Sequence, residues 1–159
     1  MIKNSFVCKI NKKNILKNYN FFKKRKKKLI VAPTIKANAY GLGDIFVLKY
    51  LIQHGCKNFF VATLEEGIKL NIKNKKINIY ILNGIQDNSI DLFYKNNLIP
   101  IINSLKELKI VKNSNIDFGL HIDTGLNRLG INYHDIPNSI YNNKKIKLIL
   151  SHLASADEK

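Results

Sequence analysis

The chain has 159 residues and a formal net charge of +16, with 27 lysines and arginines against 11 aspartates and glutamates. This length suffices for one sizeable core but falls short of the ~250 residues of a complete α/β barrel. Lysine, asparagine and isoleucine make up nearly half of the chain, so the positive charge reflects a general bias rather than a nucleic-acid-binding surface, and we expect no nucleic-acid partner.

The same features bear on the compartment. No run approaches the ~20 apolar residues of a membrane helix, and the N-terminus lacks the apolar core of a signal peptide. The two cysteines, Cys8 and Cys56, and the four histidines show neither a disulfide pattern nor metal-ligand spacing. We therefore expect a cytoplasmic protein with no metal site and no membrane association.

Apolar or alternating runs take turns with segments of helical periodicity along the chain. Strands are predicted near residues 29–36, 58–63, 77–83, 98–102, 118–124 and 146–152. Helices are predicted at roughly 11–27, 44–54, 65–74, 87–96, 104–113 and 134–142, several of them opened by a capping residue, namely Asn11, Asp44, Asp87, Ser104 and Asp135. This alternation indicates βαβ units and hence an α/β domain with a parallel sheet, spanning residues 1–159 without an internal boundary.

The most informative segment is VAPTIKANAYGLG, residues 31–43. The apolar residues 29–35 predict a strand buried on both faces, which ends at Lys36 near the dry core. Desolvation lowers the pKa of an ammonium group, and only a neutral amine attacks an aldehyde, so Lys36 fits a Schiff-base role. Chance alone could put a lysine there in so lysine-rich a chain. The Asn38, Tyr40 and glycines that follow are harder to explain in that way.

Several other polar residues also follow predicted strands. Asn83, the loop after Asp123, and His152 each lie at or just after the C-terminal end of a strand, as Lys36 does. In a parallel α/β barrel that edge carries the chemistry. The sequence therefore predicts one site to which several strands contribute.

Four runs carry a resemblance to a known family: KANAYGLG (36–43), VATLEEG (61–67), HIDTGLNRLGI (121–131) and SHLASADE (151–158). In this order they resemble the motifs of the alanine racemases, pyridoxal-phosphate enzymes built on a TIM-type barrel with a second, β-rich domain. The resemblance implies a partial TIM-type (β/α) barrel of about six parallel strands with intervening helices. It also implies that the chain stops about midway through the barrel, with the C-terminal β domain absent.

The resemblance also assigns roles to residues. It implies that Lys36 holds pyridoxal 5'-phosphate and acts as the catalytic base, and that the Tyr40 hydroxyl binds the cofactor phosphate. It places Arg128 near the cofactor and the substrate carboxylate, where a guanidinium can form two parallel hydrogen bonds. His152 would support the cofactor site. Taken singly, Tyr40 could be an ordinary helix-start tyrosine and His152 an ordinary core histidine.

One position departs from the family pattern. His121 stands where many alanine racemases have a lysine that becomes carbamylated and steadies the neighbouring arginine, and a histidine cannot carry that modification. By strand alternation Asp123 points the same way as His121, so it is a candidate for the lost negative charge. Gly41 and Gly43 predict a tight turn into a helix whose N-terminus would favour an anion.

The implied activity is interconversion of L-alanine and D-alanine for peptidoglycan synthesis, by an enzyme that is a homodimer when complete. The family's second base and the arginine facing the pyridine nitrogen would lie beyond Lys159, so we expect no racemisation by this chain alone. A non-catalytic cofactor-binding remnant and another barrel-type pyridoxal-phosphate racemase or decarboxylase remain alternatives. A hydrolase triad of Ser151 or Ser155 with His152 and Asp157 is disfavoured, because these residues are sequence neighbours and no G-x-S-x-G run occurs.

Overall fold

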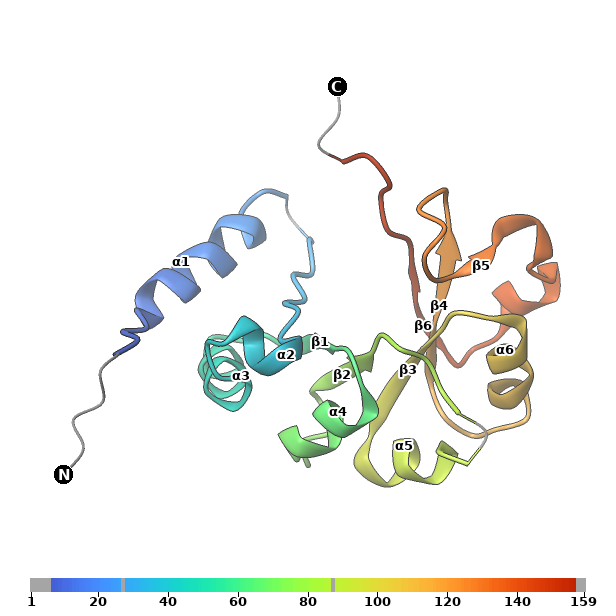
Figure 1. The fold of residues 1–159 in the computed structure, drawn as a ribbon, viewed down its shortest axis with the longest axis horizontal. Helices are drawn as coiled ribbons and strands as arrows, with labels where there is room; N and C mark the ends of the chain where they lie inside the picture. The colour runs from blue at the N-terminus through green and yellow to red at the C-terminus, as the bar shows by residue number, and fades with distance from the viewer. Residues whose placement is uncertain (1–6, 27, 87, 157–159) are drawn as a thin grey trace.

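A computed structural model describes residues 7–26, 28–86 and 88–156 of the chain. Its centre is a parallel sheet with helices in the connections (Figure 1). The strands are β1 (Asn58–Val61), β2 (Asn78–Ile81), β3 (Leu98–Ile102), β4 (Phe118–Asp123), β5 (Ile131–Asn132) and β6 (Ile146–Leu150). They pair in the order β1, β2, β3 and β4, with β6 along the first part of β4 and β5 against its last two residues. Every pairing is parallel, as predicted.

The helices also follow the predicted alternation, with one exception. They are α1 (Lys12–Lys23), α2 (Lys36–Tyr40), α3 (Asp44–Gln53), α4 (Leu64–Leu70), α5 (Ile90–Asn96) and α6 (Leu105–Lys112). The exception is α2, which was not predicted. Asn11 and Ser104 cap helices as predicted, whereas Gly43 takes the cap position of α3 and Asp44 is its first residue. The predicted cap Asp87 and the end of the first predicted helix at Lys27 lie outside the described residues.

The predicted helix over 134–142 is wrong. Two short 3-10 turns, η1 (Tyr133–Asp135) and η2 (Asn138–Asn142), take its place, and the β-region residue Pro137 separates them. Proline has no backbone N–H and its ring clashes with a preceding helical turn, so the apolar spacing around it cannot form one helix.

The predicted first strand, residues 29–36, is also wrong. Ile30 is 74% exposed, and the segment pairs with β1 through a single bridge between Thr34 and Phe60. Pro33 cannot donate to a strand ladder, although its carbonyl accepts the Phe60 N–H at 3.0 Å. The segment thus reaches the sheet only at its end. That contact puts Lys36 just beyond the edge of β1.

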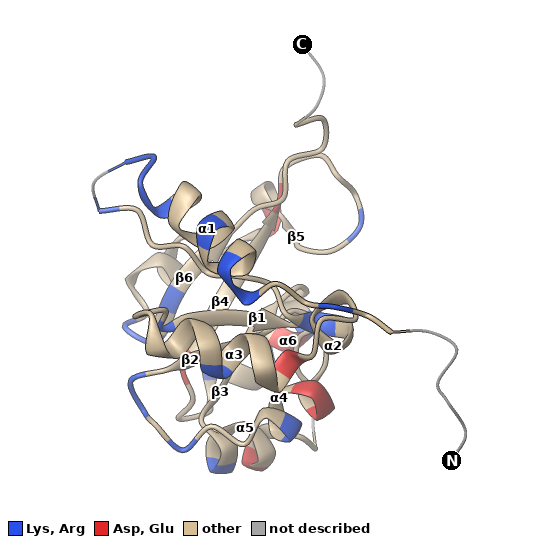
Figure 2. Ribbon diagram, turned by 90° about the vertical axis from the view of Figure 1, so that its left-hand side faces the viewer, with Lys and Arg blue, Asp and Glu red and all other residues tan. Residues whose placement is uncertain are grey.

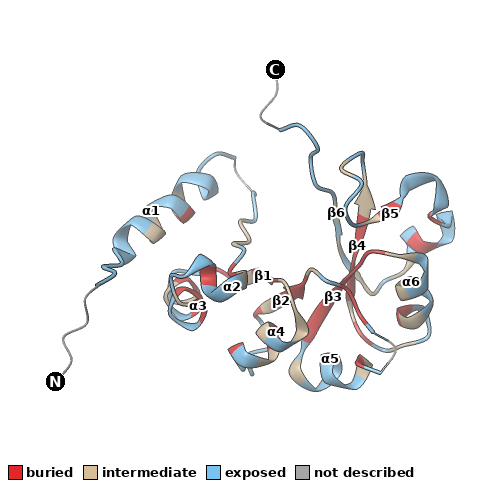
Figure 3. Cartoon of the chain, viewed as in Figure 1, coloured by how far each residue is buried: buried red, intermediate tan, exposed pale blue. Residues whose placement is uncertain are grey.

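Buried residues run along the central strands (Figure 3), and they form two apolar clusters. Successive strand residues point to opposite faces. Phe59 and Ile79 belong to the larger cluster, which includes buried residues of helices α3 to α6, whereas Tyr80 and Ile101 belong to a smaller cluster on the other face. The Phe60 and Tyr80 rings stack there with centroids 4.9 Å apart. Helices therefore cover one face, and the other face holds its own apolar layer.

Helix α4 lies unusually close to the sheet. A Cβ atom added at Gly67 would be only 2.7 Å from Cδ1 of Ile81, so only glycine allows this approach without a shift. A reciprocal capping box between Thr63 and Glu66 opens the helix. Packing and cap together fix the start of α4 beside the carboxyl end of β1.

Lysine and arginine residues are spread over α1, α5, β6 and several loops rather than gathered on one face (Figure 2). This distribution agrees with a compositional origin of the net charge. None of the helices in the described part of the chain is long and apolar enough to cross a membrane.

Candidate active site

A cavity of about 520 Å³ opens at the carboxyl end of the sheet. Its volume lies within the range of ~300–1,000 Å³ typical of small-molecule sites. The lining includes all four residues predicted to serve the site, Lys36, Tyr40, Arg128 and His152, together with Asn83 and His121. These residues come from chain segments far apart in sequence, so the fold brings the separate motifs to one cavity. We call it the carboxyl-end cleft.

Lys36 opens a turn with a rare backbone conformation. Ala37, Asn38, Ala39 and Tyr40 all have left-handed φ angles between 49° and 54°. Such a conformation costs about 1–2 kcal/mol for each residue other than glycine. Lys36 itself is half-buried and lines the cleft. What distinguishes this lysine is the strained turn that carries it.

Hydrogen bonds from three directions hold the turn. The Ala37 N–H donates to Oε1 of Glu66 at 2.7 Å, and the Ala39 N–H donates to the Ile35 carbonyl at 2.9 Å. The side chain of Asn38 accepts the Asp44 N–H at 3.1 Å. Sequence reasoning did not assign a role to Glu66. The T-x-x-E spacing within VATLEEG is the signal that could have drawn attention to it.

The expected anion site at the start of α3 is not open. Oδ1 of Asn38 accepts the Asp44 N–H, and Oδ1 of Asp44 accepts the Ile45 N–H at 2.7 Å. The Asp44 carboxylate also pairs with Lys69 at 2.8 Å. Burial alone would raise the pKa of Asp44, but the Lys69 ammonium and the Ile45 N–H lower it below its ordinary value. A negative side chain therefore already occupies this helix end.

Arg128 lies on an exposed loop whose backbone is fixed by Asp123. Oδ1 of Asp123 accepts the N–H groups of Gly125 at 3.0 Å and Asn127 at 3.1 Å. These two bonds lower the pKa of Asp123 and keep it ionised at neutral pH. Gly130 closes the loop at φ 110°, where a Cβ atom would be 2.7 Å from the Asp123 nitrogen. The carboxylate that the sequence suggested as a counter-charge is thus engaged in shaping the Arg128 loop.

His121 is buried and held by a neighbour that the sequence did not reveal. Nδ1 of His121 lies 2.8 Å from Oδ1 of Asn103, whose Nδ2 donates to the Leu82 and Ile101 carbonyls at 2.9 Å each. Because these donors fix the amide orientation, Oδ1 is the acceptor and Nδ1 of His121 carries the proton. Nε2 is then the acceptor nitrogen of a ring that lines the cleft.

The protonation state of His121 follows from its surroundings. Burial lowers the pKa of His121, the Asp123 charge opposes that shift, and His152 and Arg128 add to it. The lowered pKa leaves the imidazole neutral at pH 7. A neutral His121 therefore places no second positive charge beside Arg128.

His152 follows β6 and is exposed at the rim of the cleft. The neighbouring Ser151 hydroxyl lies 2.6 Å from the hydroxyl of Thr124, the residue after β4, so it is paired with Thr124 rather than with His152. Asp157 and Glu158, which complete the SHLASADE run, lie outside the described residues. This geometry gives no support to a serine hydrolase arrangement.

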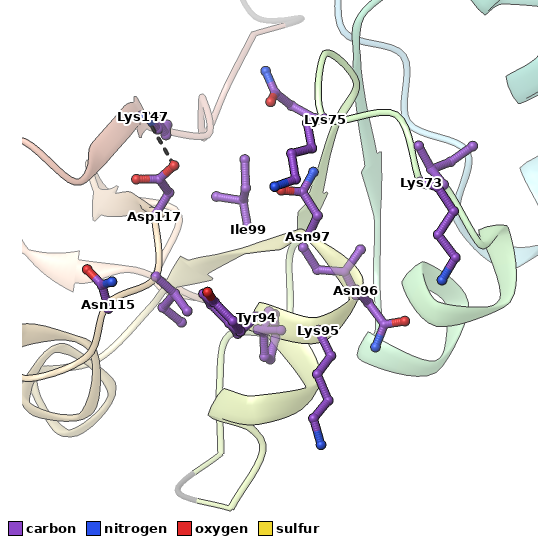
Figure 4. A pocket seen from close by; sticks show the side chains of 15 residues that line it. Lys73, Lys75, Tyr94, Lys95, Asn96, Asn97, Ile99, Asn115, Asp117 and Lys147 are labelled. Atoms are coloured by element: carbon purple, nitrogen blue, oxygen red, sulfur yellow. Dashed lines mark ion pairs between the residues drawn. The ribbon is translucent and has the colours of Figure 1, made fainter.

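A second cavity of about 610 Å³ lies at the opposite, amino end of the strands (Figure 4). Lysines 73, 75, 95 and 147 line it, and Lys147 pairs with Asp117 at 3.1 Å. None of the residues singled out from the sequence motifs lines it. Among the described residues, no group of three or more His, Cys, Asp or Glu side chains is arranged to hold a metal ion.

The fold is thus a partial parallel α/β barrel with a cleft at the carboxyl ends of its strands. Known proteins share this organisation. The family model for the alanine racemase N-terminal domain matches residues 10–159. The chain belongs to this family. The alanine racemase of Rickettsia bellii is 38% identical over an aligned length of 144 positions, and the match covers 83% of this chain and 35% of that protein. That of Rickettsia rickettsii is 37% identical over an aligned length of 161 positions, and the match covers 94% of this chain and 45% of that protein.

Solved structures agree. An alanine racemase from Bartonella henselae with covalently bound pyridoxal phosphate has a TM-score of 0.78 at 29% identity, covering 91% of this chain and 46% of that one. The alanine racemase of Acinetobacter baumannii, at 21% identity and a TM-score of 0.81, shows the shared fold over 94% of this chain and 47% of that one. The chain thus spans less than half the length of these relatives, and the predicted partial barrel is confirmed as the fold.

Proposed function

We propose that this chain is the catalytic-lysine part of an alanine racemase, which interconverts L-alanine and D-alanine with pyridoxal 5'-phosphate and supplies D-alanine for peptidoglycan in the cytoplasm. One observation carries the proposal: Lys36, Tyr40, Arg128 and His152 line a single cleft at the carboxyl end of the sheet. Family membership and the covalent pyridoxal phosphate of a similar structure support it.

The donor set suits the cofactor. Pyridoxal 5'-phosphate carries an aldehyde, a phosphate and a phenolic oxygen, and the cleft offers an amine, a hydroxyl and a guanidinium. We assign the aldehyde to Nζ of Lys36, the phosphate to the Tyr40 hydroxyl and the phenolic oxygen to the Arg128 guanidinium. His152, at the rim, would support the ring. When bound, the cofactor supplies an electron sink that makes the α-proton of an amino acid acidic.

The chain's own residues would do the rest. Nζ of Lys36 would take the α-proton from one face of alanine in one direction of the reaction and donate a proton to that same face in the reverse direction. Arg128 holds the alanine carboxylate through two parallel hydrogen bonds, which fixes the α-carbon against the lysine. Because His121 is neutral, it adds no positive charge beside Arg128.

Racemisation needs proton transfer on both faces of the α-carbon. In this proposal Lys36 serves one face, and a group outside these 159 residues serves the other, in a complete enzyme that is a homodimer. By this account the 159 residues alone bind the cofactor but do not racemise alanine.

A hybrid enzyme tests the proposed function. Residues 10–159 replace the matching segment of the Rickettsia bellii alanine racemase, and conversion of L-alanine to D-alanine is measured. We expect turnover in the hybrid and its loss by at least about a hundredfold in Lys36→Arg, because a general base commonly contributes 10²–10⁴-fold. A folded hybrid without turnover, or full turnover in Lys36→Arg, would contradict the proposal.

A further inference from the structure

The side chain of Glu66 connects two parts of the chain that meet at the carboxyl-end cleft. Oε2 accepts the N–H groups of Ala62 at 2.7 Å and Thr63 at 3.3 Å, at the start of its own helix. Oε1 accepts the Ala37 N–H at 2.7 Å, from a residue 29 positions earlier. Ala37 is the first left-handed residue after Lys36. One carboxylate therefore ties the start of α4 to the turn that carries the lysine.

Helix α6 repeats this arrangement away from Lys36. Ser104 and Glu107 repeat the same spacing, with the Glu107 N–H donating to the Ser104 hydroxyl at 3.2 Å and the Glu107 carboxylate accepting the Asn103 N–H at 2.8 Å. Glu107 also meets the backbone of Ile85, which does not line the carboxyl-end cleft. Capping is thus satisfied at both helices. The bond from Glu66 to Ala37 is the one that reaches a residue adjoining a candidate catalytic group.

We propose that Glu66 is a positioning residue for Lys36, an inference that rests on the proposed function of the cleft. Four consecutive left-handed residues are unfavourable unless the surroundings fix them. A charge-assisted hydrogen bond to the first amide of the turn is among the stronger single contacts available. If this contact is lost, the turn relaxes and Nζ of Lys36 leaves its place on the cleft wall, while the helix cap remains.

Glu66→Asp separates the two tasks of the side chain. It keeps the charge and can still accept the nearby N–H groups at the start of α4, but it is one methylene too short for Ala37. Glu65→Gln is the matched control, because Glu65 is exposed in the same first turn of α4 and its loss changes the helix charge equally. Glu66→Gln keeps the length but offers only one acceptor oxygen.

The experiment measures how fast pyridoxal phosphate attaches to Lys36. The 159-residue chain and each variant are mixed with pyridoxal phosphate well below their unfolding temperatures, borohydride makes the attachment permanent, and peptide mass mapping gives the ratio of label on Lys36 to label on Lys95. We expect this ratio to fall about tenfold or more in Glu66→Asp and Glu66→Gln, since a hydrogen bond to a charged group is lost. Glu65→Gln should stay within about twofold of wild type, as is usual for an exposed surface substitution.

The outcomes separate the two claims. Absence of preferred labelling of Lys36 in the wild-type chain would overturn the proposed function itself. Preferred labelling in the wild type that persists in both Glu66 variants would overturn the positioning role alone. A purely structural role would lower the unfolding temperature without changing the ratio in the folded protein. Should Glu66→Asp fail to fold, Glu66→Gln decides by the same ratio.

Discussion

The two ends of the sheet each hold a cavity, and the larger one has more lysines. The amino-end cavity, of about 610 Å³, is lined by Lys73, Lys75, Lys95 and Lys147, whereas Lys36 is the one lysine among the described residues that lines the carboxyl-end cleft, of about 520 Å³. Positive charge alone would therefore point away from the carboxyl-end cleft.

The difference between the ends lies in how the polar groups are held. At the amino end Lys147 pairs with Asp117, and both side chains are nearly half exposed, at 46% and 45%. At the carboxyl end Lys36 sits on a turn of four left-handed residues, and the amide of Asn103 fixes the His121 ring. A site is identified by imposed geometry, because an exposed lysine on a flexible stem has no fixed direction in which to act.

The largest expected effect concerns the cationic side chains at the two ends of the sheet. In the hybrid enzyme, Arg128→Lys keeps the charge but loses the planar fork, so kcat/KM for alanine should fall about ten- to a hundredfold. Lys147→Arg makes the reverse exchange at the amino end and should leave turnover unchanged. Equal rates in Arg128→Lys and the parent hybrid would show that the loop does not hold a carboxylate.

The next largest effect concerns two ion pairs that differ in burial. Asp44 is 7% exposed, pairs with Lys69 and accepts the Ile45 N–H, so Asp44→Asn should lower the free energy of unfolding by about 1–2 kcal/mol. Asp117→Asn breaks a pair in which both side chains are nearly half exposed and should cost less than about 1 kcal/mol. Urea titration of both variants at neutral pH measures the difference. Similar values for the two would mean that burial does not distinguish these pairs.

The smallest effect concerns pH. Burial lowers the pKa of His121 from its ordinary 6.5, against Asp123 and together with His152 and Arg128, so the folded state binds fewer protons than the unfolded state just below that pH. This contribution to stability is complete above pH 6.5 and is lost as the pH falls through the lowered pKa.

His121→Gln should therefore flatten the fall in unfolding free energy between neutral and mildly acidic pH, measured by urea titration at several pH values. His134→Gln, at an exposed position in η1, is the control and should leave the slope as it is. An unchanged slope in His121→Gln would assign the pH dependence to other groups.

Much of this fold could be predicted, because alternation of apolar residues reports burial directly. The strands near 58–63, 77–83, 98–102, 118–124 and 146–152 are all present, and they pair in parallel as the βαβ pattern indicates. The errors came where proline intervened. The predicted strand over residues 29–36, which contains Pro33, pairs with β1 through one bridge. Pro137 divides a predicted helix into two turns. The two-residue strand β5 is too short to give a period.

The candidate site was likewise predictable only in part. Strand-end positions and motif order were enough to bring Lys36, Tyr40, Arg128 and His152 together. The supports were not predictable, because they depend on tertiary contacts between residues of ordinary type. Two alanines in a run give no sign of a left-handed turn, and nothing in the sequence relates Glu66 to Ala37 or Asn103 to His121. Asp123 was assigned to the arginine by alternation, whereas its carboxylate holds the loop.

The most direct test of the central claim is a complete map of label over the lysines of the wild-type chain. The 159-residue protein is treated with limiting pyridoxal phosphate, reduced with borohydride and digested, and the label on each lysine-containing peptide is counted. The account predicts that Lys36 carries most of the label, although every other lysine competes for it and the amino-end cavity offers four of them. Label spread evenly over the lysines, or concentrated on Lys73, Lys95 and Lys147, would contradict it.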